Sequence, residues 1–287
     1  MSKQVDIQQL FNSVRCVQKD ETALHTVEKS GCSDPALLLS CVDLTSLSAL
    51  DTHDGIRAMC EKAISLQASG LPTVAAVCVY PAFVKVAAEA LEGSSIKVAS
   101  VAGGFPSSQI PLRLKLEEIG YALDAGADEI DVVMPVGKFL SGEYNTVFNE
   151  FCEIRKKCGQ KILKIILETG LLPTADDVQK ASLLAIASGA DFIKTSTGKE
   201  GGGASAAAVY VMAKTVLDAV ETGVSDKRTG IKPSGGISDF ESAAQFASLV
   251  SSVLGDDFVS SETFRIGASR LANVLLKELD PDTTSQF

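Results

Sequence analysis

The chain contains no tryptophan and only two histidines, His25 and His53, both near its start. Zinc sites rely heavily on histidine and clustered cysteine, so this composition argues against a histidine-built metal site. An excess of basic charge is also missing, because the formal net charge is -10. Nucleic acids and anionic membranes bind basic faces, so neither is expected as the main partner.

Cysteine pairs with regular spacing are absent as well. The seven cysteines are scattered, odd in number and form no Cys-x-x-Cys motif; they are Cys16, Cys32, Cys41, Cys60, Cys78, Cys152 and Cys158. This pattern favours reduced thiols over a disulfide framework, and therefore a cytoplasmic protein. We also find no apolar signal-peptide core near residue 1 and no apolar run long enough to cross a bilayer. No membrane association is expected.

What the chain does have is a regular alternation of two kinds of segment. From residue 37 onward, short apolar runs lead through turn residues into longer amphipathic stretches. The alternation predicts βα units around a parallel sheet. Eight strands are expected, at 37–42, 73–79, 97–101, 129–134, 161–167, 192–195, 230–232 and 264–266. Helices are expected at 53–69, 82–92, 111–125, 144–158, 175–188, 204–220, 239–254 and 271–279.

Eight such units in about 250 residues indicate an α/β fold of the (β/α)8 TIM barrel type. We therefore expect an N-terminal helical extension (1–36), a barrel domain (37–279) and a C-terminal tail (280–287). The main alternative is a doubly wound open sheet, but no Gly-x-Gly-x-x-Gly follows the first strand. In a barrel, functional side chains gather at the C-terminal ends of the strands.

A lysine lies inside one of the predicted strands. Successive side chains of a strand point to opposite faces, so Phe192, Lys194 and Ser196 share one side. Burial lowers the pKa of an ammonium because the charged form loses water. An amine that is neutral near pH 7 is a nucleophile for a carbonyl substrate, through a Schiff base. The alternative is a snorkelling lysine whose head reaches water.

A second lysine, Lys232, stands in an equivalent run, Gly-Ile-Lys-Pro-Ser-Gly-Gly, which begins at Gly230. If the two strands are neighbours, Lys232 lies beside Lys194. One cation disfavours protonation of another, so one member of the pair is expected to titrate low. This is the environment that activates an amine.

Other polar residues follow the predicted strands. Asp43 and Thr45 come after the first, Asp131 lies in the fourth and Lys164 in the fifth. Asp131 shares a face with Glu129, and its carboxylate could relay protons or pair with a lysine. A structural salt bridge to Lys164 or Lys232 is an equally weighted alternative, because ion-pair networks also place charges in barrels.

Glycine-rich turns follow the last three strands. They contain Gly198 and Lys199, then Gly235 and Gly236, then a Gly-Ala-Ser sequence that ends at Ser269. Barrel enzymes often hold a phosphate at these turns with backbone N–H groups and a helix N-terminus. Their shared position favours a phosphate site over glycine placed only for its conformational freedom.

Five motifs, in order CVDLTSL, GADEIDVVMP, DFIKTSTGK, GIKPSGGI and FRIGAS, resemble those of the deoxyribose-phosphate aldolases. The resemblance runs from about residue 38 to about residue 276. It implies a (β/α)8 barrel that reversibly cleaves 2-deoxy-D-ribose 5-phosphate to acetaldehyde and D-glyceraldehyde 3-phosphate, with no metal and no organic cofactor. The substrate is then a small phosphosugar.

The resemblance also implies roles for individual residues. Lys194 matches the Schiff-base lysine, Lys232 the second active-site lysine and Asp131 the proton-relay aspartate. Positions around the substrate phosphate are matched by Gly198, Lys199, Gly235, Gly236 and Ser269. Supporting positions of the site are matched by Asp43, Thr45, Lys164 and Thr197.

The chain departs from the family pattern at its end, where Phe287 stands in place of a frequent terminal tyrosine whose hydroxyl reaches the active site. Two other functions stay open at this point. One is a Schiff-base barrel enzyme for a different phosphosugar or keto acid, and the other is a non-catalytic sugar-phosphate-binding barrel. The oligomeric state is open as well, a homo-oligomer included.

Overall fold

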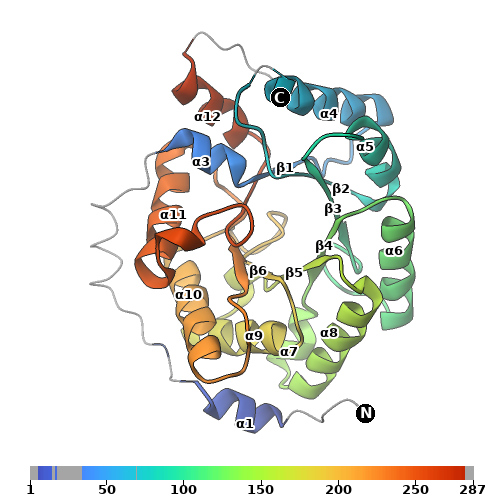
Figure 1. Ribbon diagram of the computed structural model, residues 1–287. Helices are drawn as coiled ribbons and strands as arrows, with labels where there is room; N and C mark the ends of the chain where they lie inside the picture. The colour runs from blue at the N-terminus through green and yellow to red at the C-terminus, as the bar shows by residue number, and fades with distance from the viewer. Residues whose placement is uncertain (1–5, 15–16, 18–33, 69, 282–287) are drawn as a thin grey trace.

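The computed structural model describes residues 6–14, 17, 34–68 and 70–281. Its centre is a ring of eight parallel strands (Figure 1). In chain order they are β1 (Val42–Thr45), β2 (Ala76–Val79), β3 (Lys97–Ala102), β4 (Glu129–Val133), β5 (Ile162–Ile166), β6 (Phe192–Lys194), β7 (Gly230–Lys232) and β8 (Ile266–Ala268).

The strands follow one another around the ring in the order β7-β6-β5-β4-β3-β2-β1-β8. Two bridges join the ends of this sheet, between Ile231 and Phe264 and between Ser234 and Gly267. The Ile231 amide donates to the Thr263 carbonyl at 2.8 Å, which extends the same seam. The predicted (β/α)8 barrel is confirmed.

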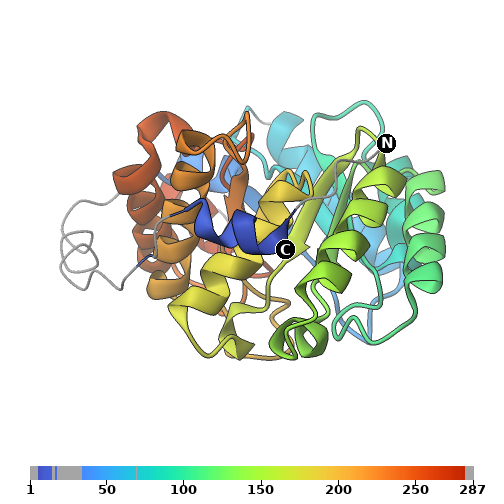
Figure 2. The same ribbon diagram turned by 90° about the horizontal axis from the view of Figure 1, so that it is seen from below.

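Helices surround the ring on its outside, as the two perpendicular views show (Figures 1 and 2). Several begin at a side chain that caps the first turn, such as Thr174 in a capping box with Asp177. The helices after β1 are α4 (His53–Ala68), α5 (Val84–Ala90), α6 (Leu112–Asp124), α7 (Val136–Leu140), α8 (Tyr144–Cys158), α9 (Ala175–Ala187), α10 (Ala206–Glu221), α11 (Phe240–Leu254) and α12 (Leu271–Leu279). Short 3-10 turns lie at η1 (Pro81–Phe83), η2 (Thr169–Leu171) and η3 (Asp256–Phe258).

The strand expected at 37–42 is wrong. That segment contains helix α3 (Pro35–Ser40), and the first strand begins only at Val42. The Asp34 carboxylate accepts from the Ala36 amide, and proline occupies the first helical position, where its missing N–H costs nothing. The apolar run buries Leu38 against the helical layer instead of joining the sheet.

The expected N-terminal extension is described only in part. Helix α1 (Ile7–Asn12) begins at Asp6, whose side chain caps it, and lies on the outside of the barrel beside α9 (Figure 1). The Phe11 ring packs edge-on against Tyr144 of α8, with ring centroids 5.1 Å apart. Residues 18–33 of the extension, and 282–287 of the expected tail with Phe287, lie outside the described residues. No helix in the described part is long and apolar enough to cross a membrane.

The inner face of the barrel divides into an apolar and a charged part. On β2 and β3 the interior is lined by small apolar side chains, among them Ala76, Cys78 and Ala99. On the opposite wall, β4 to β7 point carboxylates and amines inward. The outward-facing residues of the same strands pack on the helices in one large hydrophobic core. This hydrophobic core between the strands and the helices separates the charged side chains inside the barrel from the solvent around the protein.

Candidate active site

Lys194 and Lys232 are directly paired across β6 and β7. Both side chains point into the barrel and are almost inaccessible to solvent, at 3% and 0% exposure. The sequence-based expectation that the two lysines are neighbours is confirmed. The alternative of a snorkelling Lys194 is excluded, because its ammonium nitrogen ends inside the barrel.

Asp131, on β4, joins the two lysines. Its Oδ2 atom accepts from Lys194 Nζ at 3.0 Å and from Lys232 Nζ at 2.7 Å, while its Oδ1 atom accepts from Lys164 Nζ at 2.8 Å. The carboxylate therefore forms the salt bridges that were weighed against a relay role, and it also contacts Lys194, the lysine expected to form the Schiff base. The same position of Asp131 is therefore compatible with a structural salt bridge and with proton transfer.

A second layer of charges lies beneath this contact. Asp43 binds Lys232 Nζ at 2.5 Å and Arg265 at 2.6 Å, and Glu129 binds Lys164 Nζ at 2.5 Å and Arg265 at 3.0 Å. The network then contains three carboxylates and four cationic side chains. If Lys194 is neutral, the network has zero net charge, because Lys164, Lys232 and Arg265 then neutralise the three carboxylates.

The pKa values follow from these contacts. Burial, and then the neighbouring Lys232, lower the pKa of Lys194, with Asp131 opposing them. The pKa of Lys232 is raised, since its attraction to Asp131 and Asp43 outweighs the opposing cost of burial. The pKa of Asp131 falls well below its ordinary value because three lysines outweigh that cost. Lys194 is therefore the member of the pair that titrates low, for reasons of burial first and like charge second.

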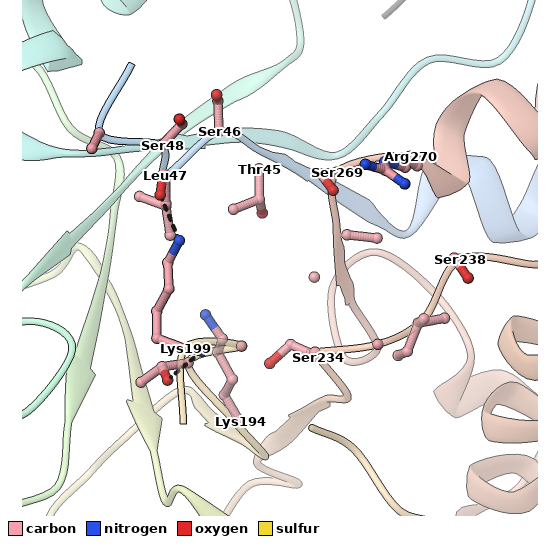
Figure 3. A pocket seen from close by; sticks show the side chains of 18 residues that line it. Thr45, Ser46, Leu47, Ser48, Lys194, Lys199, Ser234, Ser238, Ser269 and Arg270 are labelled. Atoms are coloured by element: carbon pink, nitrogen blue, oxygen red, sulfur yellow. Dashed lines mark hydrogen bonds between the residues drawn. The ribbon is translucent and has the colours of Figure 1, made fainter. Parts of the chain in front are cut away.

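An open cavity of about 590 Å³ lies above Lys194, at the C-terminal ends of the strands. Figure 3 shows the Lys194 side chain rising from its floor, with Ser234 beside it and Ser269 on the opposite side. No carboxylate lines this cavity among the described residues. The same described residues contain no group of three or more His, Cys, Asp or Glu side chains placed to hold a metal ion.

The turns after β6 and β7 form one wall of the cavity through glycine backbone. Gly198, Gly235 and Gly236 all have positive φ, between 74° and 86°, which L side chains rarely adopt. A Cβ on Gly235 would lie 2.8 Å from the Gly203 Cα, so the two loops touch through bare backbone. Helix α12 begins after Arg270 without a side-chain hydrogen bond to cap it, and Arg270 also lines the cavity.

Comparison with known proteins agrees with this geometry. Residues 37–276 match the family model described as DeoC/LacD family aldolase. The chain belongs to this aldolase family. It is 41% identical to the Homo sapiens deoxyribose-phosphate aldolase over 260 residues, which are 86% of this chain and 80% of that protein. The Bos taurus deoxyribose-phosphate aldolase is 40% identical over 263 residues, 87% of this chain and 81% of the relative.

Among solved structures, the deoxyribose phosphate aldolase of Aeropyrum pernix is 26% identical and superposes with a TM-score of 0.69, covering 91% of this chain and 99% of that one. That protein is tetrameric. The resemblance drawn from the motifs is therefore confirmed, and this chain is a member of a family of carbon–carbon lyases.

The aldolase brings the residues selected from its sequence into one region. Those that line the cavity are Thr45, Lys194, Thr197, Gly198, Lys199, Gly235, Gly236 and Ser269. Those that lie beneath it in the ion network are Asp43, Asp131, Lys164 and Lys232. Lys199 donates from its ammonium to the Leu47 carbonyl at 2.7 Å, across the cavity mouth (Figure 3).

Two charged residues of the aldolase network are missing from the sequence-based selection. Glu129 lies two residues before Asp131 in the same strand, so the sequence indicates that both side chains lie on one face. It does not indicate that Glu129 pairs with Lys164 and Arg265. Arg265 precedes the strand β8 and meets Asp43 only because the ring closes. A sequence pattern contains no signal for such a contact.

Glu168 was also missed. It follows β5, is 2% exposed and has a left-handed backbone, with φ 55°. Its carboxylate oxygens accept from the Thr197 amide at 3.2 Å and 3.3 Å, and they form no ion pair among the described residues. Burial raises the pKa of Glu168, with Thr197 opposing. Through its hydrogen bonds with the Thr197 amide, Glu168 holds the turn that follows Lys194 in position.

Proposed function

We propose that this aldolase reversibly cleaves 2-deoxy-D-ribose 5-phosphate to acetaldehyde and D-glyceraldehyde 3-phosphate through a Schiff base on Lys194. The observation that carries the proposal is a buried lysine with a lowered pKa at the floor of a cavity, sharing one carboxylate oxygen with a second lysine. The names of the Homo sapiens and Bos taurus relatives support the choice of substrate.

In the proposed reaction the neutral Lys194 amine attacks the C1 aldehyde of the open-chain sugar. The carbonyl oxygen takes up two protons and leaves as water, while the nitrogen gives up one of its two protons and keeps the other as an iminium. Asp131 and Lys232 are the groups placed to move these protons, because the Asp131 Oδ2 atom lies 3.0 Å from Lys194 Nζ and 2.7 Å from Lys232 Nζ.

The iminium then accepts the electron pair of the breaking bond. Loss of the C3 hydroxyl proton forms the carbonyl of D-glyceraldehyde 3-phosphate, the C2–C3 bond breaks, and its electrons enter an enamine on C1 and C2. Protonation of the enamine carbon and attack by water release acetaldehyde and restore the free amine. Each step needs only acid–base groups and an electron sink held on the lysine.

The phosphate of the substrate would lie at the far side of the cavity from Lys194. Gly198, Gly235, Gly236 and Ser269 offer backbone and hydroxyl groups there, next to the uncapped start of α12. Binding a group remote from the reacting bond orients C1 towards the amine, which converts binding energy into rate. Asp43, Thr45, Lys164 and Thr197 are proposed as supporting residues because they lie close to the site.

Localisation and assembly follow the family in this proposal. The protein is proposed to act in the cytoplasm on a small phosphosugar, without a nucleic-acid or membrane partner. A homo-oligomer is proposed because the Aeropyrum pernix aldolase is tetrameric. Size-exclusion chromatography with light scattering measures the assembly, and a monomer at all concentrations contradicts that part.

Borohydride trapping tests the mechanism. Borohydride added with acetaldehyde should reduce the iminium and leave an ethyl group on Lys194, which peptide mass mapping locates. Lys194→Ala should abolish both labelling and turnover, whereas Lys161→Ala, a half-exposed lysine at the start of β5, should retain both. Turnover retained in Lys194→Ala rejects the assignment.

Substrate comparison separates the remaining functions. Turnover of 2-deoxy-D-ribose 5-phosphate well above that of fructose phosphates supports the proposed reaction. The reverse preference indicates a Schiff-base aldolase for another phosphosugar. Binding of the phosphosugar without turnover and without trapping indicates a silent sugar-phosphate-binding barrel.

A further inference from the structure

The two strands that carry Lys194 and Lys232, β6 and β7, are each only three residues long. Just past the lysines, the Thr195 amide donates to the Lys232 carbonyl at 3.1 Å. In a regular parallel pair, the next bond would run from the Ser234 amide to the Thr195 carbonyl. That carbonyl instead accepts from the Thr169 amide at 2.8 Å, on the side of β5. The backbone ladder therefore does not continue directly beyond the lysines.

Two buried hydroxyl groups join the strands at this point. The Thr195 Oγ1 atom accepts from the Ser234 amide at 2.9 Å and donates to the Ser234 carbonyl at 3.1 Å. In return, the Ser234 Oγ atom donates to the Ser196 carbonyl at 2.6 Å. Thr195 is 0% exposed and Ser234 is 4% exposed. A hydroxyl both donates and accepts, so each side chain replaces a pair of backbone hydrogen bonds.

The separation of β6 and β7 sets the distance between the two amines. Lys194 and Lys232 are directly paired across these strands, and both bind the same oxygen of Asp131. Repulsion between two cations falls as their distance grows. A change in strand separation therefore changes both the repulsion and the path for proton transfer.

We propose that Thr195 is a positioning residue whose hydroxyl, together with that of Ser234, fixes the separation of Lys194 and Lys232. The inference rests on the proposed function, because this separation matters for the reaction only if Lys194 forms the Schiff base. Thr195 is not among the residues that line the cavity, so it acts through the lysines and not on the substrate.

The direction of the effect follows from the groups that face Lys194. Among the described residues these are Asp131 on β4, Lys232 on β7, Cys78 on β2 and Glu168 after β5. Removing a neutral hydroxyl changes no charge in this set. Asp131 stays with Lys194, because β4, β5 and β6 remain joined by their own ladders, whereas Lys232 moves with β7. Less repulsion from Lys232 then raises the pKa of Lys194.

The experiment compares Thr195→Val, which removes the hydroxyl and keeps the shape, with Thr195→Ser, which keeps the hydroxyl. Thr215→Val on α10 is the matched control, because the Thr215 hydroxyl is equally buried and donates to the Val211 carbonyl at 2.7 Å within its own helix. For each full-length variant, the rate of cyanoborohydride-dependent labelling of Lys194 by acetaldehyde is measured across pH. Turnover of 2-deoxy-D-ribose 5-phosphate gives kcat and KM.

We expect the midpoint of the labelling profile to rise in Thr195→Val. The rise is roughly 0.3 to 0.5 pH units if the two nitrogens separate by about 1 to 2 Å. The same displacement should lower kcat by about 10-fold to 100-fold, with a much smaller change in KM. Thr195→Ser should stay close to the wild type. Thr215→Val should keep the wild-type midpoint even where it unfolds more easily.

An unchanged or lower midpoint in Thr195→Val overturns the inference, whatever happens to kcat. Equal effects of Thr195→Val and Thr195→Ser also overturn it, because the hydroxyl is then not responsible. If Thr195→Val does not fold, Ser234→Ala decides: a smaller upward shift supports the inference and an unchanged midpoint rejects it. Absence of labelling in the wild-type protein rejects the proposed function itself, whereas normal wild-type labelling with either failure rejects only the role of Thr195.

Discussion

Lys232→Leu tests the electrostatic basis of the site, because it removes one cation and keeps an apolar stem. The nitrogen atoms of Lys194 and Lys232 lie 3.0 Å and 2.7 Å from the same Asp131 oxygen, so less than about 6 Å separates them. Two unit charges at about 6 Å repel by roughly 3 kcal/mol at an effective dielectric constant of about 20. That energy corresponds to roughly two pH units in the titration of an amine.

The sign follows from which form of Lys194 reacts. Lys232 lowers the pKa of Lys194, so its removal raises that pKa. Asp131, no longer shared with Lys232, then stabilises the ammonium form of Lys194 further. Since only the neutral amine attacks an aldehyde, the acid limb of the rate profile should move upward by roughly one to two pH units. Activity at neutral pH should fall.

The assay is the initial rate of cyanoborohydride-dependent labelling of Lys194 by acetaldehyde, measured across pH. The midpoint of this profile reports the titration of the amine, even if the loss of a proton-transfer group lowers all rates together. Lys161→Leu is the control, because Lys161 pairs with Asp128 at the surface at 3.0 Å. A midpoint in Lys232→Leu that is unchanged or lower refutes the like-charge argument, while leaving the identity of the nucleophile intact.

Three further predictions concern stability. Asp131→Asn leaves buried cations without their shared carboxylate and should lower the free energy of unfolding by about 3–5 kcal/mol in urea titrations at neutral pH. Because the pKa of Asp131 is depressed on folding, the wild-type advantage should shrink as pH falls through that depressed pKa; a pH-independent difference contradicts the ion-pair explanation. Glu168→Ala removes the acceptor of the buried Thr197 amide and should cost about 1–3 kcal/mol, whereas Glu168→Gln, which keeps an acceptor oxygen, should cost less; equal losses would show that the hydrogen bond is unimportant. Gly203→Ala places a Cβ 2.4 Å from the Gly235 carbonyl oxygen on a left-handed backbone, so thermal unfolding should show a loss of at least about 1–2 kcal/mol together with a lower kcat/KM; wild-type behaviour would show that the loops can separate freely.

Much of the fold was readable from the sequence because each βα unit is a local pattern. Short apolar runs and amphipathic stretches recur along the chain, and each of the eight expected strands shares at least one residue with a strand of the structure. The first shares only Val42, since an apolar run such as 37–42 fits a buried helix as well as a strand. The Asp34 and Pro35 pair that starts helix α3 is a helix signal.

The two lysines that we propose for the active site were also visible in the sequence, because a cation in the middle of an apolar strand is unusual wherever that strand lies. The period of two placed Lys194 on the same face of its strand as Phe192, and in the structure Lys194 points into the barrel. The glycine turns were equally local features. Together with the family resemblance, these signals selected eight of the eighteen residues that line the cavity, and they missed others such as Ser46 and Leu47.

What the sequence by itself determined is therefore the eightfold βα pattern, which side chains share a strand face, and the two lysines that we propose for the active site. Only the tertiary structure decided which charges meet. Arg265 and Asp43 are 222 positions apart and come together because the last strand closes on the first. The low pKa of Lys194 depends on burial and on its distance from Lys232 and Asp131. Both are properties of the closed ring, because desolvation and Coulomb energy depend on positions in space that no local pattern contains.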